Sequence, residues 1–193
     1  MNPVSIIDPL GDFSAREDGD GSMLYLIPAA GLALLVATEY RKTPFDAVFD
    51  EIGAEEGVGS DLLRAIARQE SNLDPSAVGA RNANGTRDYG LMQINSVTAR
   101  KFGAEPDTLV TSREHPDPVV VKRSIRIAAR LLKAVRSELG DRSNFWTMIA
   151  AYNAGSPAIK KRGIFNGAYV ANVLWHHQLY SLGSLLRRRE GYV

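Results

Sequence analysis

The stretch from Pro118 to Leu139 constrains the fold more than any other part of this sequence. Apolar residues recur there every third or fourth position, and basic residues fall between them. This spacing matches the 3.6-residue turn of an α-helix, so one face of the segment is apolar and suited to pack against a core. The segment therefore predicts a long amphipathic helix, which Gly140 stops.

Other segments show the same helical spacing, with Ser60 and Asn95 as expected N-caps of two of the helices. These segments are residues 44–52, 60–70, 95–102, 144–154 and 168–182. Residues 75–88 are rich in Gly, Asn and Asp, which is typical of a surface loop. No alternation of apolar and polar residues is long enough to predict a sheet. We expect a mainly α fold.

Length and composition limit the classes of function. A chain of 193 residues is long enough for one domain and an appendage. Its 23 basic and 22 acidic residues give a net charge of +1, which does not favour a nucleic-acid partner. There is no cysteine, and the three histidines lack the spacing of a zinc site. We expect no metal and no cofactor.

A segment near the N-terminus is more apolar than the rest of the chain. Gly21 to Thr38 contains no charged residue and lies between Asp20 and Glu39. Its length is close to the minimum for a membrane-spanning helix, so we expect residues 21–40 to anchor the chain in a membrane. A buried helix of the globular domain is the alternative. Residues 1–20 are acidic and are expected to form a flexible arm that binds a partner, and residues 183–193 a basic tail.

Glu70 is the residue that points to a chemistry. It extends the apolar face of residues 60–70. Cleavage of a glycosidic bond needs a carboxylic acid whose pKa is raised by an apolar site, so that the acid protonates the departing oxygen near neutral pH. By itself a glutamate in a helix is usually solvated and paired with a neighbour. Four short segments of the chain, the first of which contains Glu70 itself, support a catalytic role.

These segments are Glu70-Ser71, Gly90-Leu91-Met92-Gln93, Ala151-Tyr152-Asn153-Ala154-Gly155 and Tyr169-Val170. In order and type they resemble the four motifs of the soluble lytic transglycosylase family, which has a lysozyme-like fold and is related to goose-type lysozyme. The resemblance covers residues 48–180 and implies a catalytic domain at 43–182. It implies cleavage of the β-1,4 bond between N-acetylmuramic acid and N-acetylglucosamine in peptidoglycan, with a 1,6-anhydromuramyl product.

The resemblance also implies residue roles. Glu70 is the catalytic acid, with Tyr152 and Tyr169 directed toward it. The expected substrate-binding residues are Ser71, Met92, Gln93 and Asn153. For each, an ordinary structural role is the alternative: a core aromatic, a helix cap or a turn.

A second carboxylate would change the reaction, because a hydrolase needs a base or a nucleophile. Asp74 and Asp88 are the candidates, and Asn95 stands where goose-type lysozymes carry an aspartate. We expect a single catalytic carboxyl group. The alternatives are a lysozyme-like hydrolase and a non-catalytic wall-binding component.

The cellular setting follows from the expected anchor. Arg41 and Lys42 follow the apolar segment, which by the positive-inside rule keeps the domain on the cytoplasmic side, whereas peptidoglycan lies outside. A virion component that meets the wall during delivery would resolve this conflict. An inner-membrane protein of a secretion machine is the other expected setting, with action in the periplasm or cell wall.

Overall fold

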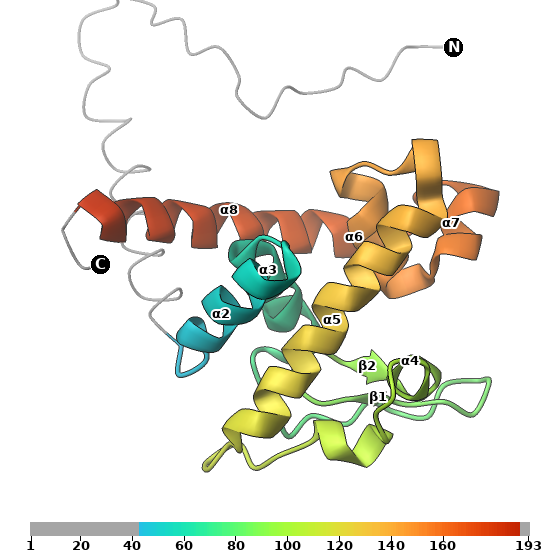
Figure 1. Cartoon of the computed structure of the whole chain (residues 1–193). Helices are drawn as coiled ribbons and strands as arrows, with labels where there is room; N and C mark the ends of the chain where they lie inside the picture. Colours follow the sequence, from blue (N-terminus) through green and yellow to red (C-terminus); the bar gives the residue numbers. More distant parts are fainter. Residues whose placement is uncertain (1–42, 190–193) are drawn as a thin grey trace, which may run out of the picture. The chain divides into compact units, whose positions relative to one another are not determined.

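The computed structural model describes residues 43–189, and Figure 1 shows their arrangement. The mainly α prediction is confirmed for this part of the chain. The elements, in chain order, are α2 (Asp46–Glu56), α3 (Ser60–Ser71), β1 (Asp88–Tyr89), β2 (Ile94–Asn95), α4 (Ser96–Lys101), η1 (Pro106–Leu109), α5 (Pro118–Leu139), η2 (Gly140–Arg142), α6 (Phe145–Ala154), α7 (Ser156–Arg162) and α8 (Gly167–Arg189).

Helix α5 has the bounds that its pattern predicts. The Asp117 carboxylate accepts a hydrogen bond from the Val119 N–H at its start, and Gly140 with φ 56° follows its end. Its apolar face is buried against α2 and α6, and Figure 1 shows α5 crossing the domain between them. Its basic face meets the glutamates of α2, as in the Lys122–Glu51 pair at 2.6 Å. Helix α5 thus packs against both α2 and α6.

Helices α3 and α8 form the most extensive helix pair of the described residues. Helix α8 runs past the expected end at Leu182 to Arg189, so the first part of the expected basic tail is helical. Residues beyond the expected helix contribute to the packing, since Ser184 donates a hydrogen bond to the Asp61 carboxylate at 3.0 Å. This pair matters for function because α3 carries Glu70 and α8 carries Tyr169.

A small hairpin follows the loop after α3. Asp88 pairs with Asn95 and Tyr89 with Ile94 in an antiparallel arrangement. With two residues each, β1 and β2 are too short to show any alternation in sequence. At the start of their turn, Gly90 has φ 69°, and a Cβ there would lie 2.0 Å from the Leu109 carbonyl oxygen. Only glycine fits this position.

The predicted cap of α3 is wrong, whereas that of α4 is confirmed. Gly59 is the N-cap of α3, and Ser60 is its first helical residue. The Ser60 hydroxyl instead accepts a hydrogen bond from Arg64, which is 2% exposed. The Asn95 side chain accepts a hydrogen bond from the Val97 N–H and caps α4.

The expected arm at residues 1–20 and the expected anchor at residues 21–40 lie outside the described residues. Within residues 43–189, no helix has both the length and the apolar character that a membrane span requires.

Candidate active site

Glu70 lies in the last turn of α3. Asn72, in the left-handed conformation with φ 55°, ends this helix. Apolar residues on the same helix are fully buried, which holds Glu70 at the border between the core and a cleft. The cleft has a volume of about 690 Å³. The residues that line it are Glu70, Asn82, Asp88, Gln93, Ile94, Asn95, Thr98, Lys101, Leu131, Val135, Glu138 and 151–157.

The Tyr169 hydroxyl donates a hydrogen bond of 2.6 Å to Glu70 Oε1. Burial raises the pKa of Glu70 to about 7; the Tyr169 hydrogen bond opposes this rise, and the nearby charge of Asp88 adds to it. A carboxyl group with this pKa is available both as an acid and as a base near neutral pH. The pairing of Tyr169 with Glu70 matches the role that the motifs imply.

Tyr152 lies in the same electrostatic environment but has a different partner. Its hydroxyl donates a hydrogen bond of 2.9 Å to the Met92 carbonyl oxygen. Burial raises the pKa of Tyr152 well above its ordinary value, and the charges of Glu70 and Asp88 raise it further. Tyr152 therefore connects α6 to the Gly90–Gln93 turn and stays a neutral donor beside Glu70.

Two of the expected substrate-binding residues have other roles in this structure. The Met92 side chain is 0% exposed and belongs to the core. The Ser71 hydroxyl donates a hydrogen bond of 2.7 Å to the Leu91 carbonyl oxygen and does not line the cleft. Both residues hold the turn against α3. Burial of Met92 and the backbone hydrogen bond of Ser71 do not favour substrate contact by these two side chains, and such contact stays a prediction.

Gln93 and Asn153 do line the cleft. Gln93 has φ 43°, and its side-chain amide donates hydrogen bonds to the Ala77 and Gly90 carbonyl oxygens. Asn153 is exposed and lies in the last turn of α6. Their contact with substrate stays a prediction, and their positions fit it.

Comparisons with known proteins agree with this geometry. The model of the transglycosylase SLT domain family matches residues 47–169, which include the cleft. The chain belongs to this family. This SLT transglycosylase is 37% identical over 117 residues to protein IpgF of Shigella flexneri, covering 59% of this chain and 69% of IpgF.

Two longer proteins also contain a similar domain. Membrane-bound lytic murein transglycosylase F of Alcanivorax borkumensis is 35% identical over 108 residues, which are 53% of this chain and 20% of that protein. The structure of an inactive Glu-to-Gln mutant of lytic transglycosylase Slt from Pseudomonas aeruginosa superposes with a TM-score of 0.51 at 25% identity. The match covers 83% of this chain and 28% of Slt. This superposition shows that the fold is lysozyme-like and mainly helical.

Of the two aspartates that the sequence offers, only Asp88 lines the cleft of this transglycosylase. Its two carboxylate oxygens accept hydrogen bonds from the side-chain amides of Asn95, at 2.9 Å, and Asn82, at 3.2 Å. Asp74 accepts hydrogen bonds from the Ser76 N–H and hydroxyl. Burial raises the pKa of Asp74, but these hydrogen bonds and the charge of Arg113 outweigh burial and lower it. Asp74 is therefore a turn residue.

Sequence reasoning missed several residues of the cleft. Lys101 on α4 and Glu138 on α5 form an exposed ion pair of 3.5 Å in its wall. Asn82 lies in the loop before β1, and the sequence predicts Asn95 as a helix cap and as the residue in place of a goose-type aspartate, but not as part of the cleft wall. Charged and amide residues are common on any surface, so only the folded arrangement brings these residues together.

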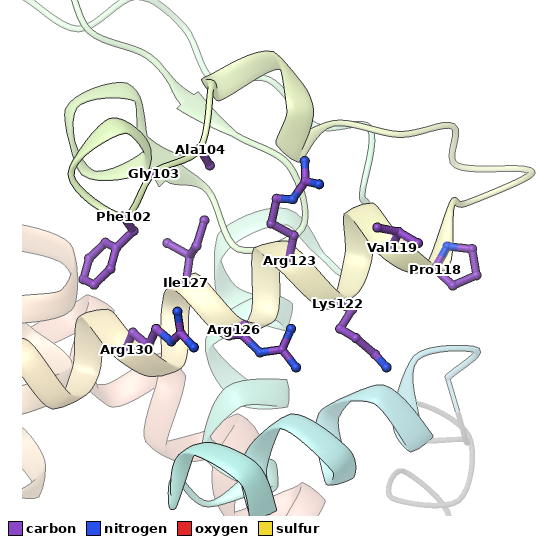
Figure 2. Close-up of a pocket in the computed structure, with 10 residues that line it drawn as sticks. All are labelled: Phe102, Gly103, Ala104, Pro118, Val119, Lys122, Arg123, Arg126, Ile127 and Arg130. Carbon is purple, nitrogen blue, oxygen red and sulfur yellow. The ribbon is translucent and has the colours of Figure 1, made fainter.

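A second pocket, of about 410 Å³, lies beside the N-terminal half of α5 (Figure 2). Its lining is apolar and basic, and Lys122 and Arg126 point toward α2, where they pair with Glu51 and Glu55. No carboxyl side chain lines it, so it offers no proton donor for glycan cleavage. Within residues 43–189, no cluster of His, Asp or Glu is suited to hold a metal.

Proposed function

We propose that this SLT transglycosylase is a peptidoglycan lytic transglycosylase. Its substrate is the β-1,4 bond between N-acetylmuramic acid and N-acetylglucosamine, and its product carries a 1,6-anhydromuramyl end. The observation that carries the proposal is the Tyr169–Glu70 hydrogen bond at the edge of a polar cleft, with the pKa of Glu70 raised to about 7. The names of two relatives, which are lytic transglycosylases, support it.

Glu70 performs both proton transfers of the reaction. As the acid it gives its proton to the glycosidic oxygen while the bond to the muramyl C1 breaks. As the resulting carboxylate it accepts the proton of the muramyl C6 hydroxyl, whose oxygen then bonds to C1 and closes the anhydro ring. The carboxyl group is restored and no water is consumed. Tyr169 holds the carboxyl group in place through both steps.

A lysozyme-like hydrolase is the second candidate, because Asp88 lines the same cleft as Glu70. A hydrolase would use Asp88 to activate water or stabilise the intermediate. Each oxygen of Asp88 already accepts one amide hydrogen bond, from Asn82 or from Asn95. This arrangement favours a structural role for Asp88 and hence a single catalytic carboxyl group.

We also propose that residues 21–40 anchor the enzyme in a membrane and that it acts in the periplasm or cell wall. The uncharged run from Gly21 to Thr38 supports this, and one relative is named as membrane-bound. The three relatives described above come from bacteria, and none is named as a virion protein. They give no support to a virion setting, and the secretion-machine setting stays a hypothesis.

The test is mass spectrometry of purified peptidoglycan digested with wild-type protein and with the Glu70→Gln variant. We expect anhydromuramyl products from the wild type and none from the variant, since an amide has no proton to give at this pH. Asp88→Asn is the matched control and should keep the anhydromuramyl products. Reducing-end products from the wild type would establish the hydrolase instead, and equal lysis by Glu70→Gln would exclude Glu70 as the acid.

A further inference from the structure

Asn166, in the link between α7 and α8, contacts the cleft residue Asn153. The side-chain NH2 group of Asn166 donates one hydrogen bond of 2.9 Å to Asn153 Oδ1. It donates a second hydrogen bond of 3.1 Å to the Ala150 carbonyl oxygen. Both partners belong to α6, so the link before α8 is tied to the end of the helix that carries Asn153.

These two contacts fix the orientation of both amides. A backbone carbonyl oxygen only accepts hydrogen bonds, so the group of Asn166 that faces Ala150 must be its NH2 group. The second hydrogen of that NH2 group points at Asn153, which must therefore present its oxygen to Asn166. The NH2 group of Asn153 is then left for the cleft. Within residues 43–189, no hydrogen bond takes up this donor.

The two ends of the Asn166 amide differ in their hydrogen bonding: the NH2 group has two partners, and the oxygen has none among the described residues. This oxygen, Oδ1, is buried. Burying an unpaired carbonyl oxygen is unfavourable, and an apolar side chain of similar shape would avoid that cost. An apolar side chain would also lose the two hydrogen bonds of the NH2 group, so these bonds, one of them to Asn153, are what the amide supplies at this position.

We propose that Asn166 is a positioning residue that makes Asn153 a hydrogen-bond donor toward the bound glycan. The group recognised is an acceptor oxygen, either the carbonyl of an N-acetyl group or a sugar hydroxyl. This inference rests on the proposed function, because it takes the ligand of the cleft to be an amino-sugar glycan. It adds a residue outside the four motifs to the substrate-binding machinery.

A double-mutant cycle tests the coupling between the two residues. The variants are Asn166→Leu, Asn153→Ala and the double variant, and the probe is a peptide-free tetrasaccharide of peptidoglycan glycan. Its Kd is measured by calorimetry with every protein, the wild-type reference included, also carrying Glu70→Gln so that the probe is not cleaved, and kcat and KM are measured with Glu70 intact. We expect Asn153→Ala to weaken binding about 5- to 10-fold, the worth of one hydrogen bond, and Asn166→Leu to weaken it in the same direction. In the Asn153→Ala background, Asn166→Leu should have no further effect on Kd.

Asn172→Leu is the matched control, since it places the same substitution at an exposed position of α8. Asn153→Asp is a second variant that does not depend on refolding around Asn166. It still accepts the hydrogen bond from Asn166 but presents oxygen to the cleft, so its Kd should rise at least as much as that of Asn153→Ala.

The outcomes separate the inference from the proposed function. Equal effects of Asn166→Leu in both backgrounds, wild-type affinity of Asn153→Asp, or no binding of the tetrasaccharide by the wild type would each overturn the inference. Binding with the expected coupling but without anhydromuramyl products would support the inference and contradict the transglycosylase reaction.

Discussion

At the scale of single residues, the Tyr169–Glu70 hydrogen bond predicts a pH dependence. The first step needs protonated Glu70, so kcat/KM should fall as pH rises above the pKa of about 7. The Tyr169 hydroxyl donates to the carboxylate and opposes the rise of this pKa. Tyr169→Phe should therefore raise the pKa of Glu70 and move the alkaline fall of kcat/KM to higher pH.

The control for this measurement is Tyr152→Phe. The Tyr152 hydroxyl binds the Met92 carbonyl oxygen rather than Glu70, so its removal should leave the midpoint of the alkaline fall near that of the wild type. A midpoint that stays fixed in Tyr169→Phe, or that moves to lower pH, would show that this hydrogen bond does not set the pKa.

Gly90 gives a second prediction at this scale. Its φ is 69°, and the Leu109 carbonyl oxygen lies 2.0 Å from the place that a Cβ would take, so there is no room for a side chain. Gly90→Ala should lower the free energy of unfolding by about 3 kcal/mol, from backbone strain and overpacking together. Gly103→Ala, at φ 76° with open space around it, should cost about 1 kcal/mol. Urea unfolding measures both, and equal losses would contradict the steric argument.

The sequence predicted some site residues and not others, for a physical reason. Glu70 and Tyr169 stand in motifs, and the structure joins them although 99 positions separate them. Met92 and Ser71 also stand in motifs, but Met92 is buried in the core and the Ser71 hydroxyl donates a hydrogen bond to the backbone of the turn. A motif fixes which residues are near a site, whereas side-chain direction depends on packing.

At the scale of elements, Arg64 joins α3 to α2. It is 2% exposed and forms ion pairs with Asp46 at 3.1 Å, Asp50 at 2.7 Å and Asp61 at 2.9 Å. Arg64→Leu leaves three carboxylates close together without their cation and should lower the free energy of unfolding by about 3–5 kcal/mol.

The comparison for Arg64 is Arg130→Leu, which removes a 52% exposed side chain that pairs with Glu56 of α2. Exposed ion pairs contribute little, so this variant should cost about 1 kcal/mol or less in the same denaturant experiment. A loss for Arg64→Leu no larger than that for Arg130→Leu would mean that Arg64 does not hold the two helices together.

Two helix ends followed their local signals, whereas the end of α8 did not. Gly140 stops α5, and Gly57 with φ 67° ends α2, because glycine adopts this backbone conformation without strain. The end of α8 was predicted too early because its extension is stabilised by contact with α3, as in the Ser184–Asp61 hydrogen bond. The hairpin was not predicted because two residues per strand carry no pattern.

At the scale of the whole molecule, the part described at residues 43–189 has its own hydrophobic core and contains the cleft with Glu70. A chain that lacks residues 1–42 should therefore keep kcat on soluble glycan fragments within about twofold of the full chain, since a domain with its own core folds independently. The full chain should sediment with membranes, and the shortened chain should not. A full chain that stays in the supernatant would exclude the proposed anchor.

The packing of α8 against α3 also has a consequence for the order in which activity arises. Glu70 is synthesised before Tyr169, which belongs to a helix that ends at Arg189. The carboxyl group gains its hydroxyl partner only after α8 has been made and has docked against α3. A newly made chain therefore has its acid before the acid has its partner, and a chain cut short before α8 lacks the hydroxyl that holds Glu70 in place.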